Sequence, residues 1–205
     1  MQIKDTTLIT ENFGNSISGL QYIPSYITES DHDRLIQIID EQTWLTELKR
    51  RVQHYGYKYD YKKRTADSSM YLGNLPNWIL SVAQRLEQDN LLEVFPDQVI
   101  INEYQPGQGI AGHIDCIHCF GDPIISLSLG SACVMEFTHI KTLEKIAIRL
   151  EPGSLVVLKG EARYFWQHGI APRKKDRYKG IEIVRDRRIS MTFRKVILAN
   201  QTKNY

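Results

Sequence analysis

Hydrophobic and polar residues follow two different periods along this chain, and the change comes near residue 98. Before it, apolar positions recur mainly at the three-to-four-residue spacing of an amphipathic helix. After it, short apolar runs are separated by glycine and proline, which is typical of successive β-strands. The pattern predicts helices in the first half and a β-rich second half.

Three elements are expected in the first half. Residues 19–24 alternate between apolar and polar side chains and predict a strand that ends at a proline. Thr28, with an acid three residues later, is an N-cap signature for a helix that ends near Gln42. A second helix is expected from Pro76, a residue favoured in a first turn, to about Asn90.

The second half contains a series of short strands. They are expected at residues 99–104, 124–129, 134–137, 146–150, 155–158, 164–167 and 189–196. Such a series indicates a β-sandwich or jelly roll, here preceded by helices that buttress one sheet, so the fold class is α+β and mainly β. With no repeat or linker, residues 1–205 are expected to form one domain, with its barrel core at about 98–198 and an N-terminal part at about 17–92.

Length and composition fit this single-domain interpretation. The chain has 205 residues, of which 42% are hydrophobic and 24% charged, as in an ordinary globular domain. Its first residues are polar and lack the layout of a signal peptide, and no apolar run is long enough to span a bilayer. We therefore expect a soluble, intracellular monomer with no membrane partner.

The three cysteines, Cys116, Cys119 and Cys133, are an odd number in a chain without a secretion signal. Free thiols are therefore expected rather than disulfides. Cys116 and Cys119 have the two-residue gap of a zinc knuckle, but no second pair completes four ligands, so a zinc site is not expected.

Positive charge is concentrated although the net charge is only +2. Lysine and arginine crowd into residues 49–64 and again into residues 173–188. Two such zones can face a polyanion such as nucleic acid, and the second can equally be a solvated loop, so both interpretations are kept.

His113 and Asp115 are candidate metal ligands. Alternate residues share one face of a strand, so both side chains can point at one metal while Ile114 turns away. His168 would add the third ligand from another strand. Two imidazoles and one carboxylate bind Fe(II) and leave positions open for a co-substrate and dioxygen. A lone His-x-Asp pair is ordinarily only a polar pair, and the surrounding motifs favour iron here.

Arg188 and Arg194 are candidates for binding a dicarboxylate beside that metal. They are six residues apart and therefore lie on the same face of a strand. Guanidinium groups bind carboxylates through paired hydrogen bonds. Asn102 and Tyr104, which also share a face, would add neutral hydrogen bonds.

Several ordered motifs resemble one known family, the AlkB-type Fe(II)/2-oxoglutarate-dependent dioxygenases. They are Asn102-x-Tyr104-x-x-Gly107, His113-x-Asp115, residues 125–130, residues 160–163 with His168-Gly169-Ile170, and Arg188-x-Ser190-x-Thr192-Phe193-Arg194. The resemblance runs from about Tyr22 to Val196. It implies a double-stranded β-helix, dioxygen as co-substrate, iron at His113, Asp115 and His168, and 2-oxoglutarate bound by Asn102, Tyr104, Arg188, Ser190 and Arg194.

Within that family the chain looks closest to the branch that hydroxylates a modified wobble uridine in tRNA. The segments that suggest this are residues 51–57, 102–110 and 128–131, together with Ser190. DNA-repair members usually carry an acid two residues after the iron aspartate and an asparagine in the last motif. Ile117 and Ser190 occupy those places here.

The substrate is expected to be a flipped or single-stranded base, because a duplex hides the reacting atom from a recessed metal. Basic and aromatic residues interleave in a stretch that could form a lid and stack a base, worth roughly 1–3 kcal/mol: Arg51, His54, Tyr55, Tyr57, Tyr59 and Tyr61. Arg163 is placed near the mouth of the site. The same tyrosines could instead be the packed edge of a sheet.

The leading hypothesis is therefore an oxygenase that hydroxylates or demethylates a base, in RNA (tRNA) or in alkylated single-stranded nucleic acid. The alternatives are a DNA alkylation-repair demethylase, a protein side-chain oxygenase, and a catalytically silent RNA-binding module. The complete set of candidate ligands and both arginines argue against the silent module.

Overall fold

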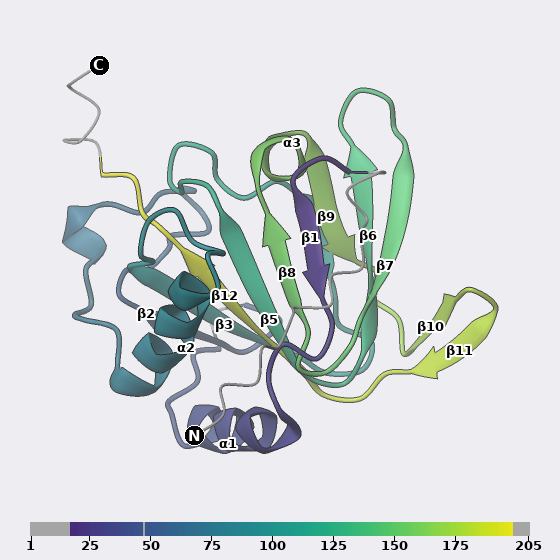
Figure 1. Cartoon of the computed structure of the whole chain (residues 1–205), viewed down its shortest axis with the longest axis horizontal. Helices are drawn as coiled ribbons and strands as arrows, with labels where there is room; N and C mark the ends of the chain where they lie inside the picture. The colour runs from purple at the N-terminus through teal and green to yellow at the C-terminus, as the bar shows by residue number, and fades with distance from the viewer. Residues whose placement is uncertain (1–16, 47, 199–205) are drawn as a thin grey trace.

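Two antiparallel sheets face each other in a computed structural model of the chain, which describes residues 17–46 and 48–198 (Figure 1). The larger sheet has the order β1 (Leu20–Ile23), β8 (Leu155–Leu158), β5 (Ile124–Gly130), β12 (Arg188–Arg194), β3 (Gln98–Tyr104) and β2 (Val52–Tyr55). The smaller sheet has the order β4 (Ile110–His113), β9 (Trp166–Ile170), β6 (Cys133–His139) and β7 (Lys145–Leu150). This arrangement confirms the mainly β fold class.

The predicted helices are present near their expected bounds. They are α1 (Glu29–Asp40) and α2 (Asn77–Gln88), and two short helices, η2 (Ser68–Met70) and α3 (Gly160–Tyr164), were not foreseen. Thr28 caps α1 by accepting a hydrogen bond from the backbone N–H of Asp31. None of the described helices is long and apolar enough to cross a membrane.

The helices cover one face of the larger sheet. Ile125 and Leu127 of β5, together with Met191 of β12, pack in one buried cluster with Leu35 of α1 and Ile79 of α2. Burying these side chains against the helices is the main favourable term in holding the two layers together. The prediction that helices buttress one sheet is therefore confirmed.

The opposite face of the larger sheet carries polar side chains although it is buried. Asn102, Ser190 and Thr192 alternate with the apolar residues of the same strands and face the smaller sheet. Burying polar groups costs free energy unless they find partners. A polar layer inside the barrel therefore marks a place built for a ligand.

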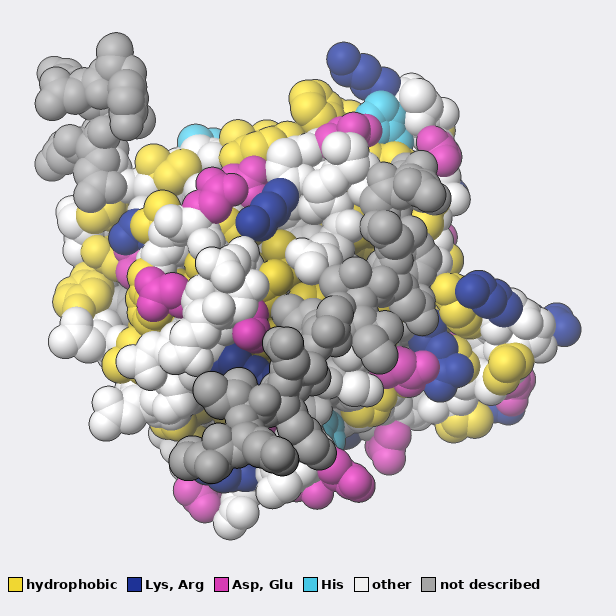
Figure 2. All heavy atoms as spheres, viewed as in Figure 1, with side chains coloured by type: hydrophobic (Ala, Val, Ile, Leu, Met, Phe, Trp, Pro, Cys, Tyr) yellow, Lys and Arg dark blue, Asp and Glu magenta, His cyan; other side chains and the backbone are white. Residues whose placement is uncertain are grey.

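A third pair of strands, β10 (Lys175–Tyr178) and β11 (Ile181–Val184), projects from the barrel as a hairpin (Figure 1). The sequence predicted only a basic stretch here. Buried Asp176 anchors the hairpin, because it accepts hydrogen bonds from Arg185, Arg173 and the backbone of β6. Lys and Arg side chains gather over it (Figure 2).

The expectation of three free thiols was wrong. Cys116 and Cys119 form a disulfide, and only Cys133 is free. The tight turn that brings the Cα atoms of the pair to 5.2 Å, inside the range that a disulfide spans, depends on backbone hydrogen bonds that residue counting does not foresee.

Candidate active site

Three candidate ligands meet at one end of the smaller sheet. His113 ends β4, and His168 on the neighbouring β9 lies directly opposite it in the strand register. Their ring centroids are 4.5 Å apart, and His168 Nε2 lies 3.9 Å from Asp115 Oδ2. Asp115 comes after the end of β4, in the following loop rather than on the strand as expected.

The close approach of β4 and β9 depends on Gly169, which follows His168. A Cβ atom at Gly169 would lie 2.8 Å from the backbone nitrogen of Gly112, closer than side chains tolerate. His113 Nδ1 lies 2.9 Å from the carbonyl oxygen of Ala111. If Nδ1 carries the proton that this contact favours, Nε2 keeps its lone pair for a metal.

Burial and neighbouring charges set the protonation of these groups. Burial by itself would raise the pKa of the Asp115 carboxyl, but Arg194 and the two histidines hold that pKa well below its usual range. Burial, with His113 nearby, lowers the pKa of His168 to about 3. The site therefore presents a carboxylate and a neutral imidazole, the forms that bind a metal ion.

An inner cavity between the two sheets begins at these ligands. All eight residues that the sequence assigned to iron and 2-oxoglutarate line it: His113, Asp115, His168, Asn102, Tyr104, Arg188, Ser190 and Arg194. Ser126 and Thr192, which entered the sequence motifs without an assigned role, also line it. The sequence feature that could have identified them is the alternation of hydroxyl and apolar residues along β5 and β12, two strands whose residues are mostly buried.

The two arginines of the inner cavity differ in their partners. Arg194 Nη2 donates to Asp115 Oδ1 at 2.8 Å, and so already has a carboxylate. Arg188 Nη2 donates to Ser128 Oγ at 2.9 Å, and its guanidinium lies 5.6 Å from the ring centre of Tyr104. No carboxylate among the described residues pairs with Arg188, and its Nε, like that of Arg194, has no hydrogen-bond partner there.

An outer cavity opens on the other side of two of these ligands, His113 and Asp115. His113, Asp115 and Arg194 line both cavities, and the outer cavity adds Arg50, Tyr59, Tyr61, Arg64, Ile114 and Phe120. Arg50 Nε donates to Asn102 Oδ1 at 2.7 Å, which links the two cavities. The sequence quoted Tyr59 and Tyr61 only as parts of an aromatic stretch and passed over Arg50 as a ligand contact.

The other residues that the sequence assigned to the substrate lie outside this outer cavity. Arg51 binds Glu103 through two hydrogen bonds of 2.6 Å, and Tyr55 packs edge-on against Trp78 of α2. His54 contacts Tyr61, with ring centroids 5.9 Å apart. The reason is that β2 is part of the larger sheet rather than a separate lid.

Tyr57 and Arg163 also lie outside the outer cavity. Tyr57 packs against Tyr71, with ring centroids 5.0 Å apart. Arg163 is buried at 2% exposure and donates to the carbonyl oxygens of Asp115, Cys116 and Phe120, so it supports the loop that carries Asp115.

Comparisons with known proteins agree with this geometry. The fold matches a solved structure described as "The structure of OsALKBH1", with a TM-score of 0.68 and 16% identity over 86% of this chain and 96% of that one. The chain is 37% identical to uncharacterized protein L905 of Acanthamoeba polyphaga mimivirus, over 89% of this chain and 87% of that protein.

A mouse protein named tRNA (carboxymethyluridine(34)-5-O)-methyltransferase ALKBH8 is 38% identical over 87% of this chain, which spans only 30% of the mouse protein. The resemblance to AlkB-type dioxygenases is thereby confirmed. Residues 19–194 match the family model described as the 2OG-Fe(II) oxygenase superfamily. The chain therefore belongs to that superfamily and is a 2-oxoglutarate-dependent dioxygenase.

Proposed function

We propose that the protein binds Fe(II) through His113, Asp115 and His168, binds 2-oxoglutarate in the inner cavity, and oxidises a nucleic acid base in the outer cavity. The observation that carries this proposal is that His113 and Asp115 line both cavities, while His168 lines the inner one beside them. A metal bound there would contact a co-substrate on one side and a substrate on the other.

The residues present fit both cofactors. Two imidazoles and a carboxylate are the donor set of non-haem iron oxygenases and leave coordination positions open. Arg188 is a buried cation without a carboxylate partner among the described residues, and its Nε is unsatisfied. A buried charge in that state is costly, so an anionic ligand such as the distal carboxylate of 2-oxoglutarate would complete it. Ser190 and Tyr104 line the same cavity and can add neutral hydrogen bonds.

When bound, iron and 2-oxoglutarate supply the oxidation of a substrate C–H bond by dioxygen, with succinate and CO2 as co-products. The chain's own residues position the reactants. Arg194 holds the Asp115 carboxylate by a direct hydrogen bond, and Arg163 donates to the backbone carbonyl oxygens of Asp115 and of Phe120 in the loop that follows it. Apolar side chains such as Met135, Leu150 and Ile170 line the inner cavity and exclude water from it.

The outer cavity supports a nucleobase as the substrate. Tyr59 and Tyr61 meet edge to face at 5.0 Å, and the Arg50 guanidinium lies 5.7 Å from the ring centre of Tyr61. Aromatic rings beside arginines are the combination that binds unstacked bases and their phosphates. The name of the mouse relative refers to a tRNA uridine, and this favours tRNA as the nucleic acid.

The test is to add air to anaerobic protein that holds Fe(II) and 2-oxoglutarate, and to follow succinate with bulk tRNA, methylated single-stranded DNA or neither. We expect tRNA to raise succinate release, and His113→Ala to abolish it. Absence of succinate under every condition, or full turnover in His113→Ala, would overturn the oxygenase assignment. Stimulation by methylated DNA alone would overturn the preference for tRNA.

The products separate the two possible outcomes for the base. Oxidation of an N-methyl group releases formaldehyde, whereas oxidation of a stable carbon leaves a hydroxyl on the base, adding one oxygen to its mass. We expect hydroxylation, and formaldehyde in proportion to succinate would show demethylation instead.

A matched pair of variants tests the outer cavity. Tyr61→Ala should lower the tRNA-stimulated turnover by about tenfold, because a base stacked on an aromatic ring gains roughly 1–3 kcal/mol. Tyr57→Ala is the control, since Tyr57 packs on Tyr71 outside the outer cavity. Equal losses in the two variants would argue against a base in the outer cavity.

A further inference from the structure

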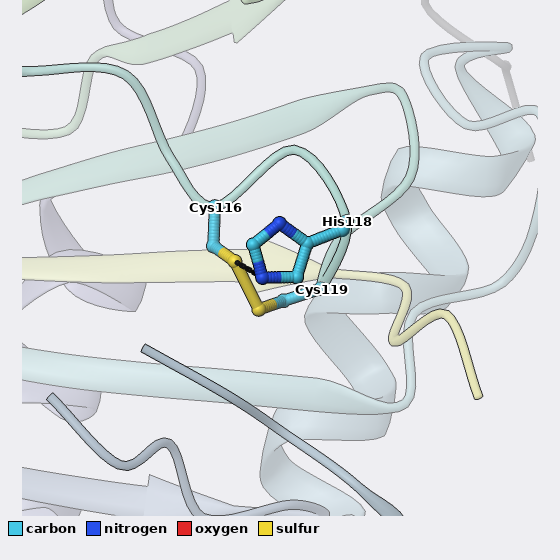
Figure 3. Close-up of side chains that lie close together, drawn as sticks. All are labelled: Cys116, His118 and Cys119. Carbon is cyan, nitrogen blue, oxygen red and sulfur yellow. Dashed lines mark hydrogen bonds between the residues drawn. A yellow bond between two sulfur atoms is a disulfide. The ribbon is translucent and has the colours of Figure 1, made fainter. Parts of the chain in front are cut away.

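The loop that follows Asp115 contains two cysteines that the proposed function does not use. Cys116 and Cys119 are joined by a disulfide that closes a four-residue turn (Figure 3). His118 lies beside them, with Nε2 3.4 Å from Cys116 Sγ. Cys133 is buried and free, and it serves as an internal reference thiol.

The backbone of this turn brings the two sulfur atoms together independently of the bond between them. The N–H groups of Cys119 and Phe120 both donate to the carbonyl oxygen of Cys116, at 3.2 and 3.1 Å. The two sulfur atoms also lie 3.4 and 3.2 Å from the same oxygen, the carbonyl of Arg64. Because these contacts do not need the S–S bond, reduced thiols would stay adjacent and ready to form it again.

A small oxidant can reach the pair although both cysteines are buried. Cys116 lines the outer cavity, next to exposed Arg64 and partly exposed Tyr59. An oxidant would therefore reach the Cys116 sulfur through the outer cavity, the cavity that we assign to the substrate. Reactivity of a thiol depends on such access as well as on its chemistry.

The disulfide joins two parts of the cavity wall. Cys116 follows Asp115, and Cys119 precedes Phe120, whose ring centre lies 4.9 Å from the Arg194 guanidinium. Buried Arg163 donates to the carbonyl oxygens at both ends of this segment. Opening the S–S bond removes the side-chain covalent link across a segment that is then held by hydrogen bonds and apolar packing.

We propose that Cys116 and Cys119 form a reversible dithiol–disulfide pair, oxidised by a hydroperoxide that enters the outer cavity, and that this modification sets the order of the cavity wall. In the first step a thiol sulfur displaces water from hydrogen peroxide and becomes a sulfenic acid. In the second step the other thiol displaces water from that sulfenic acid and the S–S bond forms. Two thiols and one peroxide give one disulfide and two waters, and an external dithiol reverses the change.

Thiol counting on the full chain tests the modification. Reduced protein, denatured in acid and alkylated, should carry three labels, whereas protein treated with hydrogen peroxide should carry one, on Cys133. Cys133→Ser is the control and should still lose two labels. Retention of all three labels in the treated wild type would overturn the proposal. So would higher sulfur oxides in place of a disulfide.

Metal binding at the same residues is the competing outcome. Ligand atoms of Cys116, His118 and Cys119 lie within 4.8 Å of one another. Zinc can be added to reduced protein in a His113→Ala background, and native mass spectrometry then counts the ions retained. We expect the same count when Cys116→Ser is added. One further zinc ion that disappears with Cys116→Ser would assign the cluster to metal and overturn the redox proposal.

The effect on the cavity wall rests on the proposed function and has its own measurement. Oxidised protein should bind fluorescent tRNA about threefold more tightly than reduced protein, because a pre-ordered wall loses less entropy on binding. Cys119→Ala should show no difference between the two treatments. Equal affinities for the wild type would overturn the effect on the wall. Failure of the oxygenase assay would leave the thiol count unchanged, so the two proposals fail separately.

Discussion

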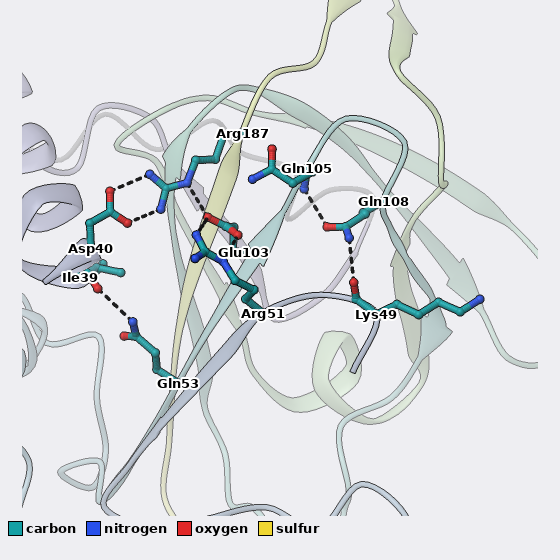
Figure 4. Close-up of polar contacts among 9 residues, drawn as sticks. All are labelled: Ile39, Asp40, Lys49, Arg51, Gln53, Glu103, Gln105, Gln108 and Arg187. Carbon is teal, nitrogen blue, oxygen red and sulfur yellow. Dashed lines mark hydrogen bonds and ion pairs between the residues drawn. The ribbon is translucent and has the colours of Figure 1, made fainter. Parts of the chain in front are cut away.

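Two consecutive arginines, Arg187 just before β12 and Arg188 as its first residue, have opposite surroundings. Arg187 donates to Glu103 at 2.6 Å and forms a two-pronged ion pair with Asp40 of α1 (Figure 4). Arg188 faces the inner cavity, is 4% exposed, and has Ser128 and the Tyr104 ring as its neighbours. One cation is fully paired, and the other has no carboxylate among the described residues.

The paired cluster extends along the outside of the larger sheet. Glu103 also accepts both hydrogen bonds of Arg51, so one buried carboxylate serves two guanidinium groups (Figure 4). On the same face, buried Gln53 donates to the carbonyl oxygen of Ile39 at the end of α1. These contacts hold β2, β3 and α1 together. Their charged groups already have partners within the protein, so no ligand is needed to satisfy them.

The same contrast between paired and ligand-facing residues occurs within strand β3. Neighbouring residues of a strand point to opposite faces, so Glu103 joins the outer network while Asn102 and Tyr104 line the inner cavity. A buried charge whose partners are complete contributes to the fold. A buried charge whose partners are incomplete costs stability and is explained by a ligand that completes it.

The largest expected effect is at Arg188, the buried arginine without a carboxylate partner among the described residues. Arg188→Met should weaken 2-oxoglutarate binding by roughly 100-fold, because a charge-assisted hydrogen bond contributes about 1.5–3 kcal/mol. The unfolding temperature should stay the same or rise, since an unpaired buried charge is removed. Calorimetry and the KM for 2-oxoglutarate measure the first effect, and a melting curve measures the second.

Arg187→Met is the matched control for that prediction. It should leave 2-oxoglutarate affinity nearly unchanged and lower the unfolding temperature, because Glu103 and Asp40 both lose a partner. Similar losses of affinity in both variants would remove the distinction between the two arginines.

The next effect is on stability. Glu103→Gln should lower the free energy of unfolding by about 2 kcal/mol, because two guanidinium groups lose their shared buried anion. Urea denaturation measures the change, with Glu144→Gln on the surface as the control. A loss below about 0.5 kcal/mol, the size of an ordinary surface change, would contradict the structural role of the cluster.

The difference in unfolding free energy between wild type and Glu103→Gln should also depend on pH. Burial by itself would raise the pKa of Glu103, but Arg51 and Arg187 outweigh burial and hold that pKa below its ordinary value of 4.5. A lowered pKa in the folded state means stability that is present above 4.5 and is lost as pH falls through the lower folded value. The stability gap between wild type and Glu103→Gln should therefore be full at neutral pH and shrink below 4.5. A gap that widened in acid would contradict this sign.

The smallest effect is at the exposed end of the cluster. Asp40 is 40% exposed in its side chain, so Asp40→Asn should cost about 0.5–1 kcal/mol. Added salt should reduce the difference, since solvent screens an exposed pair. A loss as large as that of Glu103→Gln would show that burial does not separate the two carboxylates.

Much of the fold and of the candidate site could be predicted because both depend on local periodicity. The spacing of Arg188, Ser190 and Arg194 places them on one strand face, and all three line the inner cavity. The residues expected to contact the substrate could not be placed in the same way. Apart from Arg163, they belong to a segment whose side chains divide between the sheet, α2 and the outer cavity, and the pairing of β2 with β3 decides that division.

The sequence by itself determined most of the strands, their polar faces and the identity of the candidate ligands, because those properties are set by residue type at short spacing. Only the tertiary structure decided which charges are paired and which cysteines are joined. Arg187 meets Asp40 across 147 positions, and Arg163 meets the carbonyl of Asp115 across 48. Contacts between residues so far apart in the chain depend on how the sheets and helices pack. That packing gives Arg187 its carboxylate partners and leaves Arg188 facing the inner cavity.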